Sequence, residues 1–302
     1  MIDLTNVFFA GAERPAPVCG FLQRSTPIGH VHATRPARAL RSGVAVVPEQ
    51  LSPLVRFVLQ RSGLDPGSYQ TKALHRRVGA CLRKLRVPSE DAAIGLLQDH
   101  AELVPSILST VLIGVTGFFR DPTVFAWLRD RVLARLPTGA GARVCSVGCS
   151  AGQELYSVAM LLEEQGRLAG SRLLGVDCRT EAIEQAKAGR FESSELEGLS
   201  AERLRRHFLW VHRRAIVAPR LRERTEWRAA SYSHAPEEAG WDVILCRNVA
   251  IYLAADRALR LWERLAGCLQ PGGVLVTGHA ERPPAVLGLM REASCVYRKP
   301  EN

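Results

Sequence analysis

The chain has 302 residues, of which 47% are hydrophobic and 23% are charged, and its formal net charge is +10. This composition supports a buried core and the length suits about two domains, while no apolar run reaches the ~18 residues of a membrane span. The N-terminus also lacks a basic segment followed by an apolar one, so we expect a cytoplasmic protein with no membrane insertion.

The positive charge is divided between two segments. Residues 51–139 contain 12 basic and 7 acidic residues, and residues 198–240 contain 9 and 5, whereas residues 140–197 contain 6 and 9. A sequence-independent nucleic-acid binder more often has a continuous basic face with interleaved aromatic residues, and aromatic residues make up only 6% here. We therefore predict no nucleic-acid partner, since two separate basic patches suit an acidic protein surface equally well.

The first part of the chain predicts an extension followed by helices. Residues 1–48 contain five prolines and no sustained hydrophobic periodicity, which is typical of a flexible extension. Residues 49–122 predict a small all-α domain: Leu54, Val58 and Leu59 share one helix face, and a second helix is expected over 70–85. Ser89 is a typical N-cap for a further helix. The polar side of the helix over 70–85 carries five basic residues, Lys72, Arg76, Arg77, Arg83 and Lys84.

Residues 123–302 predict a second domain of the α/β class. After a helix near 124–136, short buried-strand patterns at 143–147, 172–176, 241–246 and 274–278 alternate with helical patterns at 154–165, 181–188 and 257–269. Such alternation predicts βαβ units and a mostly parallel sheet. The alternation lapses at about 191–228, where a helix over 200–207 precedes a small β-hairpin insertion built from 208–217 and 220–228.

A nucleoside-binding site is predicted at the end of the first two strands. Gly148 and Gly152 lie in the first strand-to-helix turn, where small residues let the backbone approach a ligand, and Asp177 ends the second strand. A carboxylate there can accept both ribose hydroxyls, although a generic turn with a helix-capping Asp gives the same pattern. NAD and S-adenosylmethionine both fit. The absence of the pyrophosphate motif G-x-G-x-x-G favours S-adenosylmethionine, which carries no phosphate.

Five segments, in this order, carry a resemblance to a known family. They are TGFFRD at 116–121, SAGQELYS at 150–157, CRNVAIY at 246–252, LQPGG at 269–273 and GHAE at 278–281. From about residue 51 to residue 299 the chain resembles the CheR family, the chemoreceptor glutamate methyltransferases. The resemblance implies a Rossmann-like, seven-stranded class I methyltransferase sheet, S-adenosylmethionine as cofactor, and transfer of a methyl group to glutamate carboxylates of a chemoreceptor-like signalling protein.

The resemblance also implies roles for individual residues. Thr116 and Arg120 would reach the methionine end of the cofactor, Asp177 the ribose, and Arg247 and Asn248 the sulfonium and adenosyl groups. The remaining residues that the match assigns to the cofactor are Gly148, Gly152, Gln153, Ser231 and Tyr232.

Methyl transfer to a carboxylate needs no general base, because glutamate with a pKa of ~4.3 is ionised at neutral pH. Our hypothesis is that Arg120 and Tyr252 aim the reacting carboxylate. The alternatives are a structural ion pair of Arg120 with Asp121 or Asp130, and a core role for Tyr252 with its hydroxyl on a backbone carbonyl. The eight histidines show no metal-ligand spacing, so no metal is predicted.

Four positions depart from the family pattern: Gly114 replaces Asn, Gln153 replaces Glu, Arg179 replaces an acid, and Ser231-Tyr232 replaces Asn-Leu. Two further interpretations therefore stay open. In the first, the chain is a catalytically weakened CheR-like module that binds cofactor or scaffolds a signalling complex. In the second, it is a small-molecule methyltransferase.

Two partner surfaces follow from the same resemblance. Arg76, Arg77, Arg83 and Lys84 match the basic helix that faces acidic receptor helices in the family, although a solvated helix face is the simpler explanation. The hairpin insertion matches a subdomain with which some members dock a receptor peptide by strand addition.

Overall fold

The computed structural model describes residues 50–114, 116–136 and 140–301, and these belong to one compact unit. The predicted extension over residues 1–48 lies outside the described residues. The predicted division between residues 122 and 123 stays a prediction, since residues on both sides of it belong to this one unit. No helix in the described ranges is both long and apolar enough to cross a bilayer. The helices are α1 (Pro53–Arg61), α2 (Thr71–His75), α3 (Val78–Leu85), α4 (Glu90–Asp99), α5 (Val104–Val111), α6 (Pro122–Arg131), α7 (Gln153–Glu164), α8 (Thr180–Ala188), α9 (Ala201–His207), α10 (Pro219–Arg222) and α11 (Ala255–Cys268).

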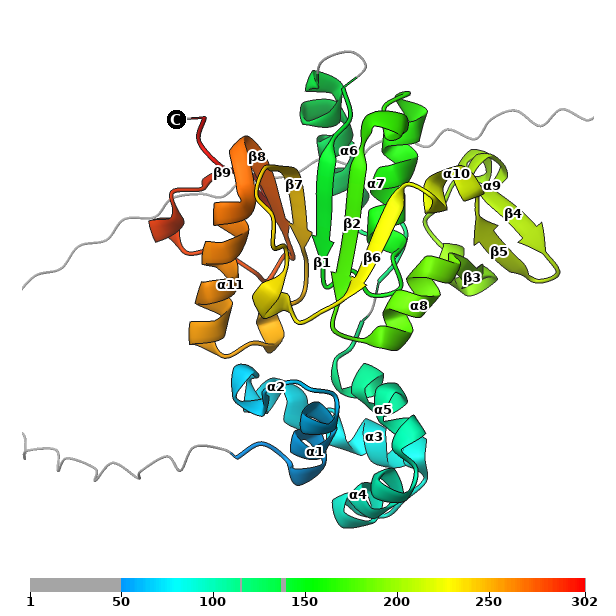
Figure 1. The fold of residues 1–302 in the computed structure, drawn as a ribbon, viewed down its shortest axis with the longest axis vertical. Helices are drawn as coiled ribbons and strands as arrows, with labels where there is room; N and C mark the ends of the chain where they lie inside the picture. The colour runs from blue at the N-terminus through cyan, green and yellow to red at the C-terminus, as the bar shows by residue number, and fades with distance from the viewer. Residues whose placement is uncertain (1–49, 115, 137–139, 302) are drawn as a thin grey trace, which may run out of the picture. The chain divides into compact units, whose positions relative to one another are not determined.

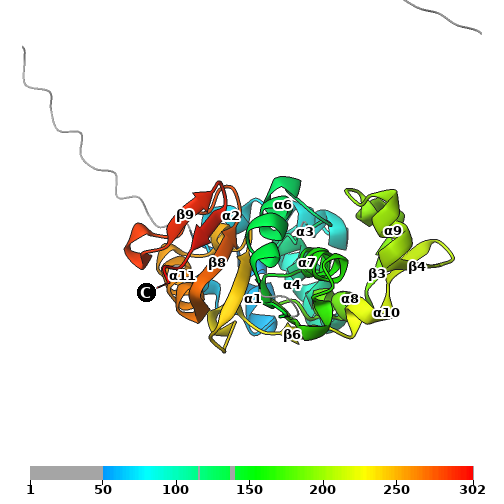
Figure 2. The same cartoon turned by 90° about the horizontal axis from the view of Figure 1, so that it is seen from above.

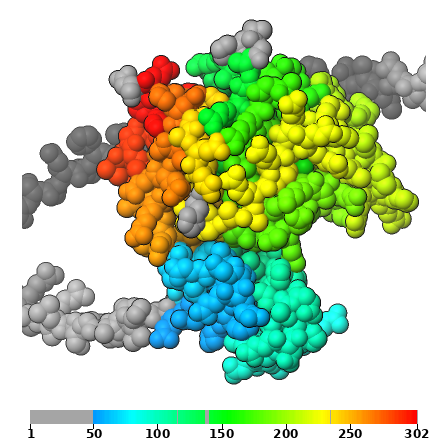
Figure 3. Space-filling model, in the orientation of Figure 1, coloured from blue at the N-terminus to red at the C-terminus, as the bar shows by residue number. Residues whose placement is uncertain are grey.

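The N-terminal helices form a small bundle at one end of the unit, drawn in blue to cyan in Figures 1 and 3. Ser52 caps α1, and the predicted N-cap Ser89 accepts a hydrogen bond from the backbone N–H of Ala92 at 3.2 Å. Glu90, at the start of α4, accepts from the backbone N–H of Leu54 at 2.9 Å. The ends of α1 and α4 are therefore tied together by side-chain hydrogen bonds.

The single helix predicted over 70–85 is wrong, because the chain breaks between α2 and α3. The backbone N–H of Arg77 donates to the carbonyl of Leu74, three residues back, at 2.9 Å. Its side chain donates from Nε to the carbonyl of Thr110 at the end of α5, at 3.1 Å. The break thus coincides with a tertiary contact, and helical periodicity alone contains no sign of it.

Seven of the ten strands in the described ranges form one sheet with the order β6-β2-β1-β7-β8-β10-β9, and the predicted fold class is confirmed. The first five are parallel, whereas β10 runs antiparallel to both β8 and β9. The strands are β1 (Arg143–Val147), β2 (Arg172–Asp177), β3 (Arg190–Glu192), β4 (Phe208–Val211), β5 (Arg214–Val217), β6 (Thr225–Ala229), β7 (Trp241–Cys246), β8 (Leu269–Thr277), β9 (Met290–Ala293) and β10 (Val296–Arg298).

Alternate side chains of the central strands enter two separate cores. Cys145 and Ile244 pack in a core shared with α11 and the N-terminal helices, whereas Val144 and Val243 pack in a core shared with α6 and α7. Because successive side chains of a strand point to opposite faces, this alternation is the expected result of covering both faces of a parallel sheet. Figure 2 shows the helices on the two sides of the strands.

The insertion is a three-stranded sheet with the order β3-β5-β4, together with α9 and α10. It extends beyond β6 at the edge of the large sheet (Figure 2). The prediction that 220–228 belongs to the hairpin is wrong: residues 219–222 form α10, and β6 pairs in parallel with β2, with Thr225 opposite Leu173. The outer strand β4 exposes three apolar side chains, Leu209, Trp210 and Val211.

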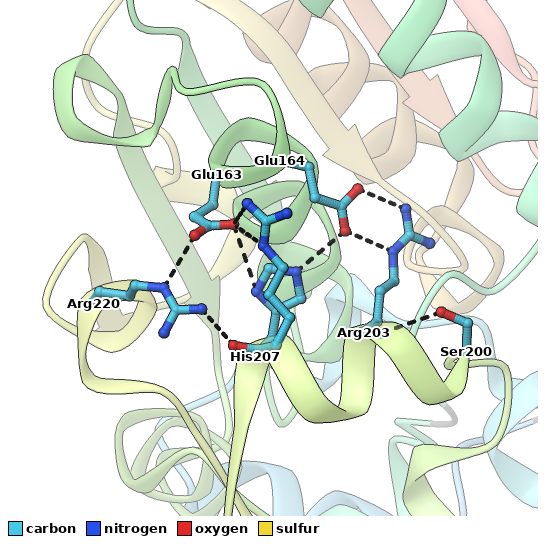
Figure 4. Close-up of polar contacts among 7 residues, drawn as sticks. Glu163, Glu164, Ser200, Arg203, His207 and Arg220 are labelled. Atoms are coloured by element: carbon cyan, nitrogen blue, oxygen red, sulfur yellow. Dashed lines mark hydrogen bonds and ion pairs between the residues drawn. The ribbon is translucent and has the colours of Figure 1, made fainter.

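A charged network joins the insertion to the C-terminal end of α7 (Figure 4). Glu164 accepts from Nε of Arg203 at 2.8 Å and lies 3.2 Å from Nε2 of His207, while Glu163 accepts from Nε of Arg220 at 3.2 Å. The His207 side chain is fully buried, and this burial lowers its pKa despite the two neighbouring carboxylates. Burial alone would raise the pKa of Glu164, but the hydrogen bonds from Arg203 and His207 lower it overall.

We expect the free energy of unfolding to fall as the pH drops from about 7 to 5. The unfolded chain binds a proton on His207 near its ordinary pKa of ~6.5, whereas the folded chain resists it, which gives a slope of at most about 1.4 kcal/mol per pH unit. Protonation of Glu164 affects the free energy of unfolding only below about pH 4.5, outside this window, because the folded chain lowers its pKa. Urea unfolding of His207→Gln should lose the slope, and the exposed His100→Gln should keep it. An unchanged slope in His207→Gln would contradict the assignment.

Candidate active site

A pocket lies at the carboxyl ends of β1, β2 and β7, where parallel sheets usually bind ligands. Eight of the residues that the sequence assigned to the site lie together in it: Thr116, Arg120, Gly148, Asp177, Tyr232, Arg247, Asn248 and Tyr252. The rest of its lining is Leu112, Ile113, Gly114, Gly117, Cys149, Ser150, Glu154, Arg179 and Val249.

Three predicted cofactor residues lie outside this lining. Gly152 is the N-cap of α7, and a Cβ on it would collide with the ring of Trp227. Gln153 borders a neighbouring groove, where its Nε2 lies 3.5 Å from Glu195 and its buried Oε1 has no hydrogen-bond partner among the described residues. Ser231 borders a separate cavity between α11 and the loop that follows α1.

The turn after β1 brings the backbone close to the opposite wall of the pocket. Gly148 has φ +74°, and its N–H donates to the carbonyl of Val176 at 2.8 Å. A Cβ at Gly148 would collide with the Cγ2 atom of Val249. The turn therefore requires glycine both for its conformation and for this close approach.

The predicted ribose ligand Asp177 is buried and already fully hydrogen-bonded. Its Oδ2 accepts from the backbone N–H of Ser150 at 2.9 Å and from Nη2 of Arg179 at 3.0 Å. Its Oδ1 accepts from the backbone N–H and from Nε of Arg179, both at 2.9 Å. Arg179, one of the departures from the family pattern, is thus directly paired with the carboxylate at the centre of the site.

Arg247 is buried between two carboxylates and does not point freely into the pocket. It pairs with Asp121 and, through Nη1, with Glu154 at 3.2 Å, and it donates to the carbonyl of Arg120 at 3.1 Å. Arg247 thereby fastens the turn at 120–121 to the first turn of α7. The other acid proposed as a partner of Arg120, Asp130, pairs with Arg129.

Glu154 is a site residue that the sequence argument missed. The departure at Gln153 drew attention to a lost charge, but it is Glu154 that lines the pocket and accepts a hydrogen bond from Ser146 at 2.9 Å. Neighbouring residues of a helix point about 100° apart, so only one of the pair can face the pocket. The signal was present in the sequence, because Glu154 is the one acidic residue of the SAGQELYS segment.

Glu281, in the GHAE segment, holds the loop that contains Asn248. Its buried carboxylate accepts backbone N–H groups from Asn248 at 2.6 Å, Val249 at 2.8 Å, Ala250 at 2.7 Å and Gly278 at 2.8 Å. An ionised acceptor with this many amide donors fixes the loop conformation strongly. The GHAE motif contains Glu281, but the sequence alone indicates no role for it.

The turn that carries Arg120 is packed against the insertion. The Phe118 ring contacts the rings of Phe191 and Phe208 edge-on, with centroids 5.0 and 5.5 Å apart. The guanidinium of Arg203 lies 3.9 Å from the ring centroid of Phe119. Arg120 itself is exposed at the pocket. The insertion is therefore part of the support of this turn.

Backbone strain gathers at the same place. Of the six non-glycine residues with positive φ in the described ranges, four lie in or beside the pocket: Phe119, Asp121, Ser150 and Asn248. Such conformations cost of order 1–3 kcal/mol each and are typical of sites whose side chains are held for a ligand.

The two tyrosines of the pocket have different surroundings. The Tyr232 hydroxyl lies 3.0 Å from Sγ of Cys178, and burial raises its pKa well above the ordinary value. Burial also raises the pKa of Cys178 to about 12, so both groups stay neutral. The Tyr252 hydroxyl makes no hydrogen bond within the described part of the chain, although the Tyr252 carbonyl accepts from the backbone N–H of Gln70 at 2.8 Å.

The chemistry of the lining fits S-adenosylmethionine in part. Glu154 and Asp177 are carboxylates that suit a cationic group and a diol, Arg120 suits a carboxylate, and Gly148 leaves backbone space that a Cβ would fill. The misfit is at Asp177, where Arg179 already uses both oxygens.

The strand order and the site at the carboxyl ends of β1 and β2 define a class I methyltransferase-type protein. Residues 114–295 match the CheR methyltransferase, SAM-binding domain, so the chain belongs to the CheR methyltransferase family. It is an S-adenosylmethionine-dependent methyltransferase of that family.

Three curated relatives illustrate the match. The chemotaxis protein methyltransferase of Listeria monocytogenes is 30% identical over 81% of this chain and 95% of its own length. Chemotaxis protein methyltransferase 1 of Pseudomonas aeruginosa is 31% identical over 76% and 88%. The chemotaxis protein methyltransferase of Escherichia coli is 28% identical over 75% and 82%.

Proposed function

We propose that the protein transfers a methyl group from S-adenosylmethionine to glutamate carboxylates of a chemoreceptor-like signalling protein. The observation that carries the proposal is the pocket, which gathers Thr116, Arg120, Arg247, Asn248 and Tyr252 at the strand ends of a CheR-type domain. The printed names of the relatives, chemotaxis protein methyltransferases, support the same substrate class.

Bound S-adenosylmethionine would supply a methyl group on a positively charged sulfur. The attacking glutamate has an ordinary pKa of ~4.3 and is already a carboxylate at neutral pH, so the chain does not have to remove a proton. One C–O bond forms as one C–S bond breaks, and the opposite charges of the two reactants cancel. The contribution of the protein is to orient the carboxylate in line with the methyl group and to exclude water.

Arg120 and Tyr252 are the residues that we propose to aim the carboxylate. Arg120 is exposed at the pocket and offers a charged fork for a carboxylate. The Tyr252 hydroxyl has no partner in the described part of the chain and can donate to one carboxylate oxygen. Glu154 and Asp121 hold Arg247 and so keep the backbone carbonyl of Arg120 in place.

We propose that the basic side of α2 and α3 contacts acidic helices of the receptor. The four basic residues that match the family's basic helix are not equivalent. Lys84 donates to the carbonyl of Ser106 at 2.9 Å and Arg77 to Thr110, so both are attached to α5. Arg76 and Arg83 are exposed and have no ion-pair partner among the described residues, which leaves them available to a partner.

Transfer of tritiated methyl groups to the acidic signalling helices of a chemoreceptor fragment tests the proposal. We expect label that alkali releases as methanol, because a glutamyl methyl ester hydrolyses in base whereas methylated nitrogen does not. Arg76→Glu with Arg83→Glu should weaken substrate binding and flatten its dependence on salt, since both effects come from the same charges.

The exposed residues Arg213 and Arg224, which have no ion-pair partner among the described residues, offer a matched charge reversal away from α2 and α3. The double variant at those positions should leave methylation of an isolated helix fragment unchanged. Cofactor binding without alkali-labile label on any receptor fragment would favour a binding module, and label on a small molecule would favour the third interpretation.

A further inference from the structure

The ribose position of the pocket is occupied by the protein itself. A carboxylate offers about four acceptor positions, and Asp177 uses all of them: three for Arg179 and one for the backbone N–H of Ser150. Arg179 is also buried and lies 3.4 Å, through Nη1, from the carbonyl of Leu112. A ribose diol can bind Asp177 only if the guanidinium leaves.

Gly114 explains how the guanidinium reaches this position. A Cβ on Gly114 would lie 2.7 Å from Cζ of Arg179 and even closer to both of its Nη atoms. The backbone at Gly114 is not in the left-handed region, so the glycine is not needed for conformation; it leaves the space in which the guanidinium lies. Gly114 and Arg179, two departures from the family pattern that lie 65 positions apart in the sequence, are thus in direct contact in the structure.

We propose that Arg179 is an internal competitor for the cofactor at Asp177, and that Gly114 provides the space that admits it. The inference rests on the proposed function of the pocket, because it concerns the same ligand. Binding of the cofactor requires Arg179 to release two side-chain hydrogen bonds to a buried carboxylate, which lowers the observed affinity. Arg179 thereby sets the cofactor concentration at which the protein is loaded.

The charge of Arg179 adds a second effect. S-adenosylmethionine carries a positive sulfonium, whereas the product S-adenosylhomocysteine is neutral at sulfur. A guanidinium that stays near the pocket after release repels the cofactor and not the product. Removal of Arg179 should therefore raise the affinity for S-adenosylmethionine more than the affinity for S-adenosylhomocysteine.

Calorimetric titration of the full chain with both compounds tests the inference. Arg179→Ala should bind S-adenosylmethionine about tenfold to a hundredfold more tightly than the wild type. Gly114→Ala should also bind more tightly, because the new methyl group forces the guanidinium to move while Arg179 is still present. In the double variant, Gly114→Ala should add nothing to Arg179→Ala, since both act through one contact.

Two controls match these substitutions. Arg129→Ala breaks an exposed ion pair with Asp130, and Gly95→Ala places a Cβ where no atom lies within 4 Å, so neither should change the affinities. Thermal unfolding establishes that each variant is folded, and Gly114→Ala keeps the test valid if Arg179→Ala does not fold.

Three results would overturn the inference. Unchanged or weaker binding by folded Arg179→Ala would mean that Arg179 supports the ligand or is neutral to it. Additive effects in the double variant would mean that Gly114 and Arg179 act separately. Binding of neither compound by any variant at millimolar concentration would overturn the proposed function as well, which distinguishes that failure from the first two.

Discussion

Glu281→Ala is expected to lower the free energy of unfolding by about 3–5 kcal/mol and to abolish methyl transfer. The substitution leaves the backbone N–H groups of Asn248, Val249, Ala250 and Gly278 without their acceptor, and each unsatisfied buried donor costs about 1–3 kcal/mol before the loop relaxes. The loop then loses the conformation that places Asn248, with φ +61°, at the pocket. Urea unfolding and the tritiated-methyl assay measure the two effects.

Glu281→Gln removes the negative charge of the side chain but keeps its size, so it tests the two contributions separately. The glutamine oxygen can still accept from Val249 and Ala250, but its NH₂ group would face the N–H groups of Asn248 and Gly278, donor against donor. We expect an intermediate loss of stability and a lower cofactor affinity in a folded protein. Glu292→Ala removes a surface acid paired with Arg298 and should change neither quantity much. Wild-type stability and cofactor affinity in Glu281→Ala would refute the role of this carboxylate.

The sheet was predictable because its signals are local. Buried β-runs that end at Val147, Asp177 and Cys246 are visible in short windows, and the alternation with helices implies a parallel sheet without any knowledge of contacts. The antiparallel end of the sheet was not predicted as strands. β9 and β10 are four and three residues long, and β10 obtains its hydrogen bonds from β8 and β9.

The errors arise where a distant contact decides the local structure. The strand β6 was assigned to the hairpin because its pairing with β2 joins Thr225 to Leu173, across the whole insertion. The helix over 70–85 was predicted whole because its break coincides with the contact of Arg77 with the end of α5. Neither contact leaves a periodic pattern in the segment that it changes.

The motifs predicted many of the residues that line the pocket, but not how these residues pair with one another. The motifs named Asp177 and Arg247 as ligand residues, whereas the structure pairs each with another charged side chain, Arg179 and Glu154. In the sequence, Gly114 and Arg179 are two separate departures from the family pattern. The two positions are related because the Arg179 side chain lies against Gly114, and this contact is visible only in the three-dimensional structure.

Arg247→Met is expected to cause the second large loss of stability and of methyl-transfer activity. Arg247 is paired with Asp121 and Glu154 in a buried position, so removal of its charge leaves two carboxylates without their common partner, which typically costs about 3–5 kcal/mol of stability. The turn at Arg120 also loses its donor to the backbone carbonyl, and a displacement of about 1 Å at a reacting group can lower turnover by about a hundredfold. Urea unfolding and the kcat of methyl transfer measure these effects.

Arg247→Lys distinguishes positioning from loss of charge. A lysine keeps the positive charge but cannot bind both carboxylates and the Arg120 carbonyl with one planar fork, so we expect most of the stability to return and kcat to recover only in part. Arg257→Met is the matched control. Arg257 also lies beside two carboxylates, Asp65 and Asp256, but at the surface, and its loss should cost less than about 1 kcal/mol. A full return of kcat in Arg247→Lys would show that charge alone, and not the fork, holds the turn.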